Sequence, residues 1–188
     1  MSTFYYILWT HYVILICMEV IMGIDPGATS GYAALTATVN PKLLLCKHVV
    51  WPKPGSKKDL PANTPSAVVE REVEALSRLG HTVIGAAIED QYLSVNPDSM
   101  KKLSRNGGRW EEAFRRLGIP VAWINTQTWQ SAELGTCKID SKEVKRRCAN
   151  KVRGLWNIRV NQNAADACII GRYEAVRAAY RIMRSGSK

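Results

Sequence analysis

Five stretches of the chain have the apolar content and spacing of β-strands. Residues 20–24 read VIMGI, a nearly continuous apolar run that is typical of a strand buried on both faces of a sheet. The other four are short apolar runs or alternate between apolar and polar residues. The predicted strands cover residues 20–24, 30–39, 43–51, 83–88 and 119–124.

Longer segments place apolar residues at the three- and four-residue spacing of an amphipathic helix. Thr64 followed by Pro65 predicts an N-cap with proline at the first helical position. Asp140 with Glu143 predicts a capping box. Because helices follow and separate the later strands, we expect an α/β fold with a mixed sheet covered by helices. The predicted helices cover residues 65–79, 97–117 with an interruption at Gly107-Gly108, 141–155 and 164–183.

The N-terminal segment has a different pattern from the rest of the chain. Residues 4–17 read FYYILWTHYVILIC, without the basic region and small-residue cleavage site of a signal peptide. The run is also short for a membrane span. Since Met18 and Met22 could both serve as starts, we interpret residues 1–17 as an apolar extension, with an edge strand or a membrane-surface anchor as alternatives. No internal repeat interrupts the remainder, so we expect residues 18–188 to form a single domain.

Composition narrows the classes of partner and metal. The chain has 26 Lys and Arg against 16 Asp and Glu, a net charge of +10, which favours a polyanion such as nucleic acid, although a basic soluble protein would show the same excess. Its five cysteines include no C-x-x-C pair, and its three histidines lack metal-ligand spacing. We therefore expect a reducing cytoplasm and no zinc site. A metal would be held by carboxylates, as Mg²⁺ or Mn²⁺ is.

Acidic residues stand where two predicted strands end and where the last helix begins. Asp25 follows the strand 20–24, and Glu89 follows the strand 83–88. If these strands are neighbours, the two carboxylates meet at one edge of the sheet and repel each other unless a cation lies between them. Asp25 could instead form a turn with Pro26-Gly27. Asp166 could serve only the helix N-terminus, with Asn163 as its N-cap.

The order of these sequences resembles one known family. G-I-D-P-G, A-I-E-D-Q-Y and N-A-A-D-A, in this order, are similar to the RuvC-type Holliday junction resolvases of the RNase H-like superfamily. N-P-D-S-M-K-K-L and W-I-N-T-Q-T-W-Q are similar to its phage branch. The resemblance extends over about residues 18–178. It implies an RNase H-like mixed five-stranded sheet flanked by helices.

The resemblance also implies a metal-dependent nuclease site. Asp25, Glu89 and Asp166 would be catalytic and would hold two Mg²⁺ ions, for which Mn²⁺ can substitute. Cleavage would leave 5′-phosphate and 3′-hydroxyl ends. Asn163 stands where the family carries Asp or His, so it is either a neutral metal ligand or the helix N-cap.

Further residues correspond to family positions outside the acidic set. Lys142 matches a catalytic lysine near the cleaved phosphate, where it would offset negative charge in the transition state. A second family lysine aligns with Trp129, which is a departure from the family pattern. Tyr92 corresponds to an aromatic residue that wedges into the junction, or it is a tyrosine at the rim of the core.

Basic residues on two predicted helices are candidates for DNA contact, although most such runs are solvated faces. The residues that we predict to bind DNA are Lys101, Lys102, Arg105, Lys145 and Arg146.

The resemblance implies a homodimer that acts on four-way junctions or other branched DNA in the cytoplasm of a bacterial or phage-infected cell, with no membrane partner. The helix from Pro97 is the expected dimer surface through Met100, Leu103 and Trp110, although this stripe could equally be core.

Two other functions fit part of the pattern. The neutral Asn163 and the missing lysine at Trp129 would also suit a junction-binding protein with weak or no nuclease activity. A phosphotransferase of the sugar kinase and actin type also has Gly-Ile-Asp at the end of its first strand. Those chains are about twice as long, with a second nucleotide-binding half, so we favour the nuclease.

Overall fold

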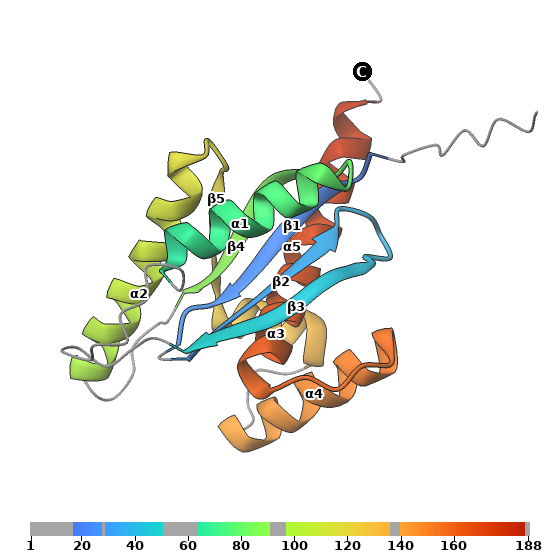
Figure 1. The fold of residues 1–188 in the computed structure, drawn as a ribbon. Helices are drawn as coiled ribbons and strands as arrows, with labels where there is room; N and C mark the ends of the chain where they lie inside the picture. The colour runs from blue at the N-terminus through green and yellow to red at the C-terminus, as the bar shows by residue number, and fades with distance from the viewer. Residues whose placement is uncertain (1–16, 28, 51–63, 91–96, 136–139, 187–188) are drawn as a thin grey trace, which may run out of the picture.

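The computed structural model describes residues 17–27, 29–50, 64–90, 97–135 and 140–186, with side chains from residue 101 onward in the fourth range. These residues form one five-stranded sheet with helices on both faces (Figure 1). The strands are β1 (Glu19–Asp25), β2 (Thr29–Thr36), β3 (Leu43–Val50), β4 (Thr82–Asp90) and β5 (Val121–Asn125), in the spatial order β3-β2-β1-β4-β5.

The pairing of β1 with its neighbours determines where the candidate site lies. β1 is antiparallel to β2 and parallel to β4. Ile24 pairs with Ile88, so Asp25 and Glu89 leave adjacent strands at the same edge of the sheet. The two strands are therefore neighbours, which is the condition under which the two carboxylates meet.

Two apolar layers hold the helices of the described residues against the sheet. The helices are α1 (Pro65–Arg78), α2 (Pro97–Arg116), α3 (Thr126–Leu134), α4 (Ser141–Trp156) and α5 (Gln162–Ser185). One layer joins Met22 and Ile24 of β1 to α1 and α2, and it includes Trp110 and Phe114. Ile21 points the opposite way, into the layer formed with α3, α4 and α5, as the alternation of side chains along a strand requires.

Helix α5 lies directly on the central strands because glycines remove the side chains between them. A Cβ atom on Gly23 would lie 2.4 Å from the backbone nitrogen of Gly171, and one on Gly31 would lie 1.9 Å from the backbone oxygen of Asn163. Gly31 pairs with Asp25 across β1 and β2. The beginning of α5, which carries Asp166, is therefore held next to the edge where β1 ends.

Several predicted boundaries are wrong. Helix α2 continues through Gly107-Gly108, since Gly107 lies against the indole of Trp123, where a Cβ atom would be 2.6 Å from a ring carbon. Helix α5 begins at Gln162, and its N-cap is Asn161, whose side chain accepts a hydrogen bond from Ala164 N. Asn163 is therefore not the N-cap. Helix α3 was not predicted from the sequence.

Trp110 is fully buried between α2 and the sheet, so the core interpretation of this residue is correct and it cannot form a dimer surface. Residues 1–16 of the N-terminal extension lie outside the described residues. In the part of the chain that the structure describes, no helix is long and apolar enough to cross a membrane.

Candidate active site

Asp25, Glu89 and Asp166 are close enough for their charges to interact. Asp25 and Glu89 are each only 8% exposed. Burial raises the pKa of Asp25 well above its ordinary value, and the negative charges of Glu89 and Asp166 raise it further. The structure therefore brings the three predicted acids to one edge of the sheet.

Asp166 contributes a buried oxygen without a partner. Its Oδ1 is buried and accepts no hydrogen bond. Burial raises the pKa of Asp166 to about 6, although the polar side chains of Cys148 and Gln162 and the charge of Lys145 act in the opposite direction. An unsatisfied carboxylate oxygen beside two other acids is chemistry that suits a hard divalent cation.

In this structure the side chains of Asp25, Glu89 and Asp166 are not arranged as ligands of one metal ion. Among the described residues, no group of three or more His, Cys, Asp and Glu side chains is placed so that it could hold a metal ion. Coordination of a shared ion by all three acids would therefore require their side chains to move.

The turn after β1 is held by α2. Ser30 Oγ donates to the carbonyl oxygen of Gly27 at 3.0 Å, and Trp110 Nε1 donates to Ser30 Oγ at 3.2 Å. Asn106 Nδ2 also donates to the Gly27 oxygen, at 3.4 Å. The backbone N–H of Gly27 in turn lowers the pKa of Asp25 by a hydrogen bond. Asp25 is therefore both a turn residue and a member of the acidic cluster.

Glu89 is fixed by α3. Its Oε1 accepts one hydrogen bond from Thr126 Oγ1 and one from Trp129 Nε1, both at 3.0 Å. Trp129 is 1% exposed, and Thr126 Oγ1 also lies 3.2 Å from the carbonyl oxygen of Asp90. Trp129 occupies the position that aligned with a family lysine, so here an indole N–H contacts the candidate catalytic carboxylate.

These contacts were missed because α3 itself was missed. Asn125 is its N-cap, and the Asn125 Oδ1 accepts from Gln127 N at 2.9 Å. Asparagine directly after a predicted strand was the signal that could have revealed this helix.

Lys145 of α4 places a positive charge near Asp25 and Asp166. Its charge lowers the pKa values of both Asp25 and Asp166. Lys142 is an exposed residue in the first turn of α4, three residues before Lys145 and on the same side of the helix. Its predicted catalytic role stays a prediction.

Asn163 is half-buried in the first turn of α5, three residues before Asp166. Its backbone lies against Gly31, and a role as metal ligand stays a prediction. Tyr92 lies outside the described residues.

The predicted DNA-binding residues lie on two helices. Lys101, Lys102 and Arg105 are exposed on α2, and Lys145 is exposed on α4. Arg146 is exposed as well, but its guanidinium forms two hydrogen bonds of 2.7 Å to Glu143.

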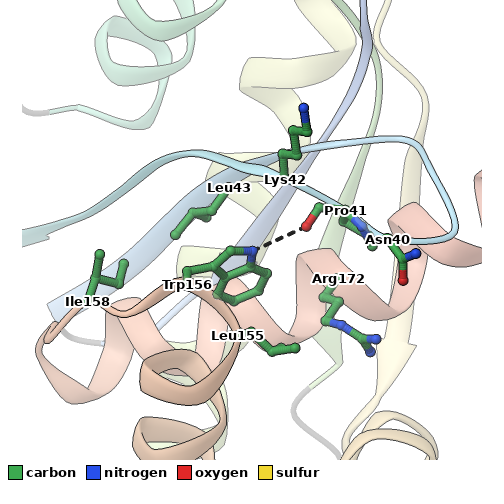
Figure 2. Close-up of a pocket in the computed structure, with 8 residues that line it drawn as sticks. All are labelled: Asn40, Pro41, Lys42, Leu43, Leu155, Trp156, Ile158 and Arg172. Carbon is green, nitrogen blue, oxygen red and sulfur yellow. Dashed lines mark hydrogen bonds between the residues drawn. The ribbon is translucent and has the colours of Figure 1, made fainter.

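A cavity of about 430 Å³ lies away from the acidic cluster (Figure 2). Figure 2 shows the indole of Trp156 in this cavity, and its Nε1 donates to the carbonyl oxygen of Pro41 at 3.1 Å. Leu43, which also lines the cavity, is at the end of β3 opposite to the strand edge of Asp25. The cavity is therefore not part of the candidate site.

The mixed five-stranded sheet flanked by helices matches the RNase H-like fold, and two solved structures with this fold are similar to the chain. Thermus thermophilus RuvC in complex with a Holliday junction substrate is similar with a TM-score of 0.65 and 23% identity, over 87% of this chain and 96% of that chain. Another T. thermophilus RuvC structure is similar with a TM-score of 0.62 and 22% identity, over the same shares. The chain thus has the fold of RuvC, and the resemblance seen in the sequence is confirmed at the level of the fold.

The yeast mitochondrial Holliday junction resolvase Ydc2 is also similar, with a TM-score of 0.45 and 13% identity over 89% of this chain and 82% of that chain. No protein-family model and no curated protein matches the sequence.

Proposed function

We propose that this protein is an endonuclease that resolves Holliday junctions and related branched DNA. The observation that carries the proposal is the convergence of Asp25, Glu89 and Asp166 at one edge of a RuvC fold, where burial and the charges of Glu89 and Asp166 raise the pKa of Asp25. The net charge of +10 suits a DNA substrate.

The three acids and the amide oxygen of Asn163 would hold two Mg²⁺ ions, with Mn²⁺ as a substitute. The ions would supply an activated water and stabilise the leaving oxygen, which gives 5′-phosphate and 3′-hydroxyl ends. Trp129 orients Glu89 through its indole N–H, and the Gly27 turn orients Asp25. Because the three acids are not grouped as ligands in the structure, binding of the ions would still require their side chains to move.

Basic side chains would hold the cleaved strand. Lys145 lies where its charge acts on the acids, and Lys142 is on the same side of α4. Either ammonium group can offset the charge that develops on the phosphate. Lys101, Lys102 and Arg105 on α2, with Arg146 on α4, would contact the DNA backbone, so affinity should fall steeply with salt.

The substrate also suggests the assembly. A four-way junction presents two equivalent strands, and a two-fold homodimer would place one acidic cluster on each. Leu103, which is partly exposed on α2, remains available to such an interface, whereas Trp110 is not. We place the activity in the cytoplasm of a bacterial or phage-infected cell.

The decisive experiment uses a labelled immobile four-way junction with Mg²⁺ or Mn²⁺ and maps the nicks on each strand. We expect paired symmetric nicks from the wild-type protein. Asp25→Asn should bind the junction as before but should not cut it. Cleavage by Asp25→Asn at the wild-type rate would show that the proposed site is wrong.

A junction-binding protein without nuclease activity is the second candidate. It is favoured by the neutral Asn163, by Trp129 in place of a lysine, and by the absence of a ready-made metal-binding group among the described residues. The same experiment separates the two functions. Binding without any cut strand in Mg²⁺ or Mn²⁺ would support the second, and a single Mn²⁺-dependent product would exclude it.

A further inference from the structure

Two cysteines that are far apart in the sequence meet between the sheet and α5. Cys46 is in β3 and Cys168 is in α5, 122 residues later, and their Sγ atoms are 2.9 Å apart. Cys168 is fully buried, whereas Cys46 is only partly buried. Both are free thiols in this structure, and Cys46 is the more exposed member of the pair.

We propose that Cys46 and Cys168 are a redox-active pair that forms a reversible disulfide when the protein meets a hydroperoxide. A disulfide S–S bond is about 2.05 Å long, so the two sulfur atoms need to approach by less than about 1 Å. They are held on elements that already pack together, and the link therefore needs no rearrangement of the fold.

The reaction proceeds in two balanced steps. The sulfur of Cys46 attacks one peroxide oxygen, the O–O bond breaks, and Cys46 becomes a sulfenic acid while one water leaves. The sulfur of Cys168 then attacks the sulfur of Cys46, the S–O bond breaks, and a second water leaves. Two thiols and one hydrogen peroxide thus give one disulfide and two waters, and a small thiol reductant reverses the change.

The other described cysteines have different surroundings. Cys17 is exposed, and its sulfur lies 3.8 Å from the hydroxyl of Thr82. Cys148 is buried, and its thiol donates to Asp166. Peroxide should therefore link Cys46 to Cys168 in preference to these two.

The link would join β3 to the part of α5 that follows the acidic cluster. Cys46 Sγ also donates to the carbonyl oxygen of Ala164, at 3.4 Å, in the first turn of α5. Oxidation removes this hydrogen bond and replaces it with a covalent bond one turn further along the helix. A cross-link between residues so distant in the sequence restricts the unfolded chain, so the oxidised protein should have a higher Tm.

The test uses the full chain, purified with a reductant and then freed of it. After brief exposure to hydrogen peroxide, the remaining thiols are alkylated and the protein is digested without reduction. We expect an intact-mass loss of about 2 Da before alkylation, one linked peptide pair containing Cys46 and Cys168, and reversal by dithiothreitol. Thermal unfolding should show the higher Tm in the oxidised sample only.

Matched variants control the result. Cys46→Ser should lose the linked peptide and the Tm shift, whereas Cys17→Ser should keep both. Alkylation of Cys46 and Cys168 after peroxide treatment, a link that joins other cysteines, or oxidation of Cys46 to a sulfonic acid without a link would each overturn the proposal. The peptide map of the wild-type protein is sufficient for this decision even if a variant folds poorly.

Discussion

The hydrogen bond from Trp129 to Glu89 gives a sharp test of how α3 contributes to the site. Trp129→Phe keeps a six-membered aromatic ring in the buried position. It removes the pyrrole ring of the indole together with the N–H that this ring carries. A hydrogen bond to a charged group contributes about 1.5–3 kcal/mol. If this energy holds Glu89 in its productive position, its loss lowers the cleavage rate roughly 10- to 150-fold.

Single-turnover cleavage of a labelled junction over a range of Mg²⁺ concentrations measures this effect. Trp129→Phe should cut more slowly at saturating DNA and should need more Mg²⁺ for half-maximal rate, because Glu89 must be ordered again each time an ion binds. Junction affinity, measured in Ca²⁺, should stay near the wild-type value because Trp129 is buried and offers almost no surface to a ligand. Thermal unfolding separates the rate effect from a loss of folded protein.

Thr126 provides a matched comparison because it donates to the same oxygen of Glu89. Thr126→Ser keeps the hydroxyl and should cut nearly as fast as the wild type, and Thr126→Val should be slower. The two losses should not add in the double variant with Trp129→Phe, since both act on one carboxylate. If folded Trp129→Phe cut at the wild-type rate with an unchanged Mg²⁺ requirement, the positioning role of Trp129 would be refuted.

Three further predictions concern packing and charge. Burial raises the pKa of Asp166 in the folded protein to about 6 from its ordinary value of 3.8. The free energy of unfolding is therefore highest below pH 3.8 and falls as the pH rises through about 6. In EDTA, Asp166→Asn should therefore raise the free energy of unfolding in urea by about 3 kcal/mol near pH 8 but little near pH 4, and an equal change at both pH values would contradict this. Gly31→Ala should lower the Tm strongly because its Cβ atom would overlap the backbone of α5, whereas Gly108→Ala, which meets no atom within 4 Å, should be neutral or stabilising; similar Tm values would contradict the close packing. Lys145→Ala should shift the acid limb of the cleavage profile to higher pH, because Lys145 lowers the pKa values of the acids, and a larger shift in Lys142→Ala would assign that role to Lys142.

The sheet and the meeting of the acids could be predicted because both follow from short-range pattern and strand direction. The apolar runs marked all five described strands, and parallel neighbours must end at one edge. Helix α3 could not be predicted in the same way, since it has only nine residues and few of them are apolar. Because α3 was not predicted, its hydrogen bonds from Thr126 and Trp129 to Glu89 were not predicted either.

Other details depended on packing that no local pattern contains. Asn161 and Asn163 are equally good caps by chemistry, and the structure uses Asn161 while the backbone of Asn163 rests on Gly31. The Gly107-Gly108 pair normally ends a helix, but contact with Trp123 and the buried Trp110 keep α2 continuous. In each case tertiary contacts override a local preference.

Stability and cleavage together distinguish a functional acidic cluster from an incidental one. Mutual repulsion and burial of Asp25 and Asp166 cost folding free energy in the metal-free protein, so Asp166→Asn should stabilise it. Loss of the Trp129 hydrogen bond to Glu89 should instead destabilise it, because a buried contact disappears. Both variants should cut DNA more slowly, although their stabilities move in opposite directions. If the cluster served only the fold, both Asp166→Asn and Trp129→Phe would lower the free energy of unfolding. The sign of the change in Asp166→Asn therefore tells whether the acids are held together for catalysis.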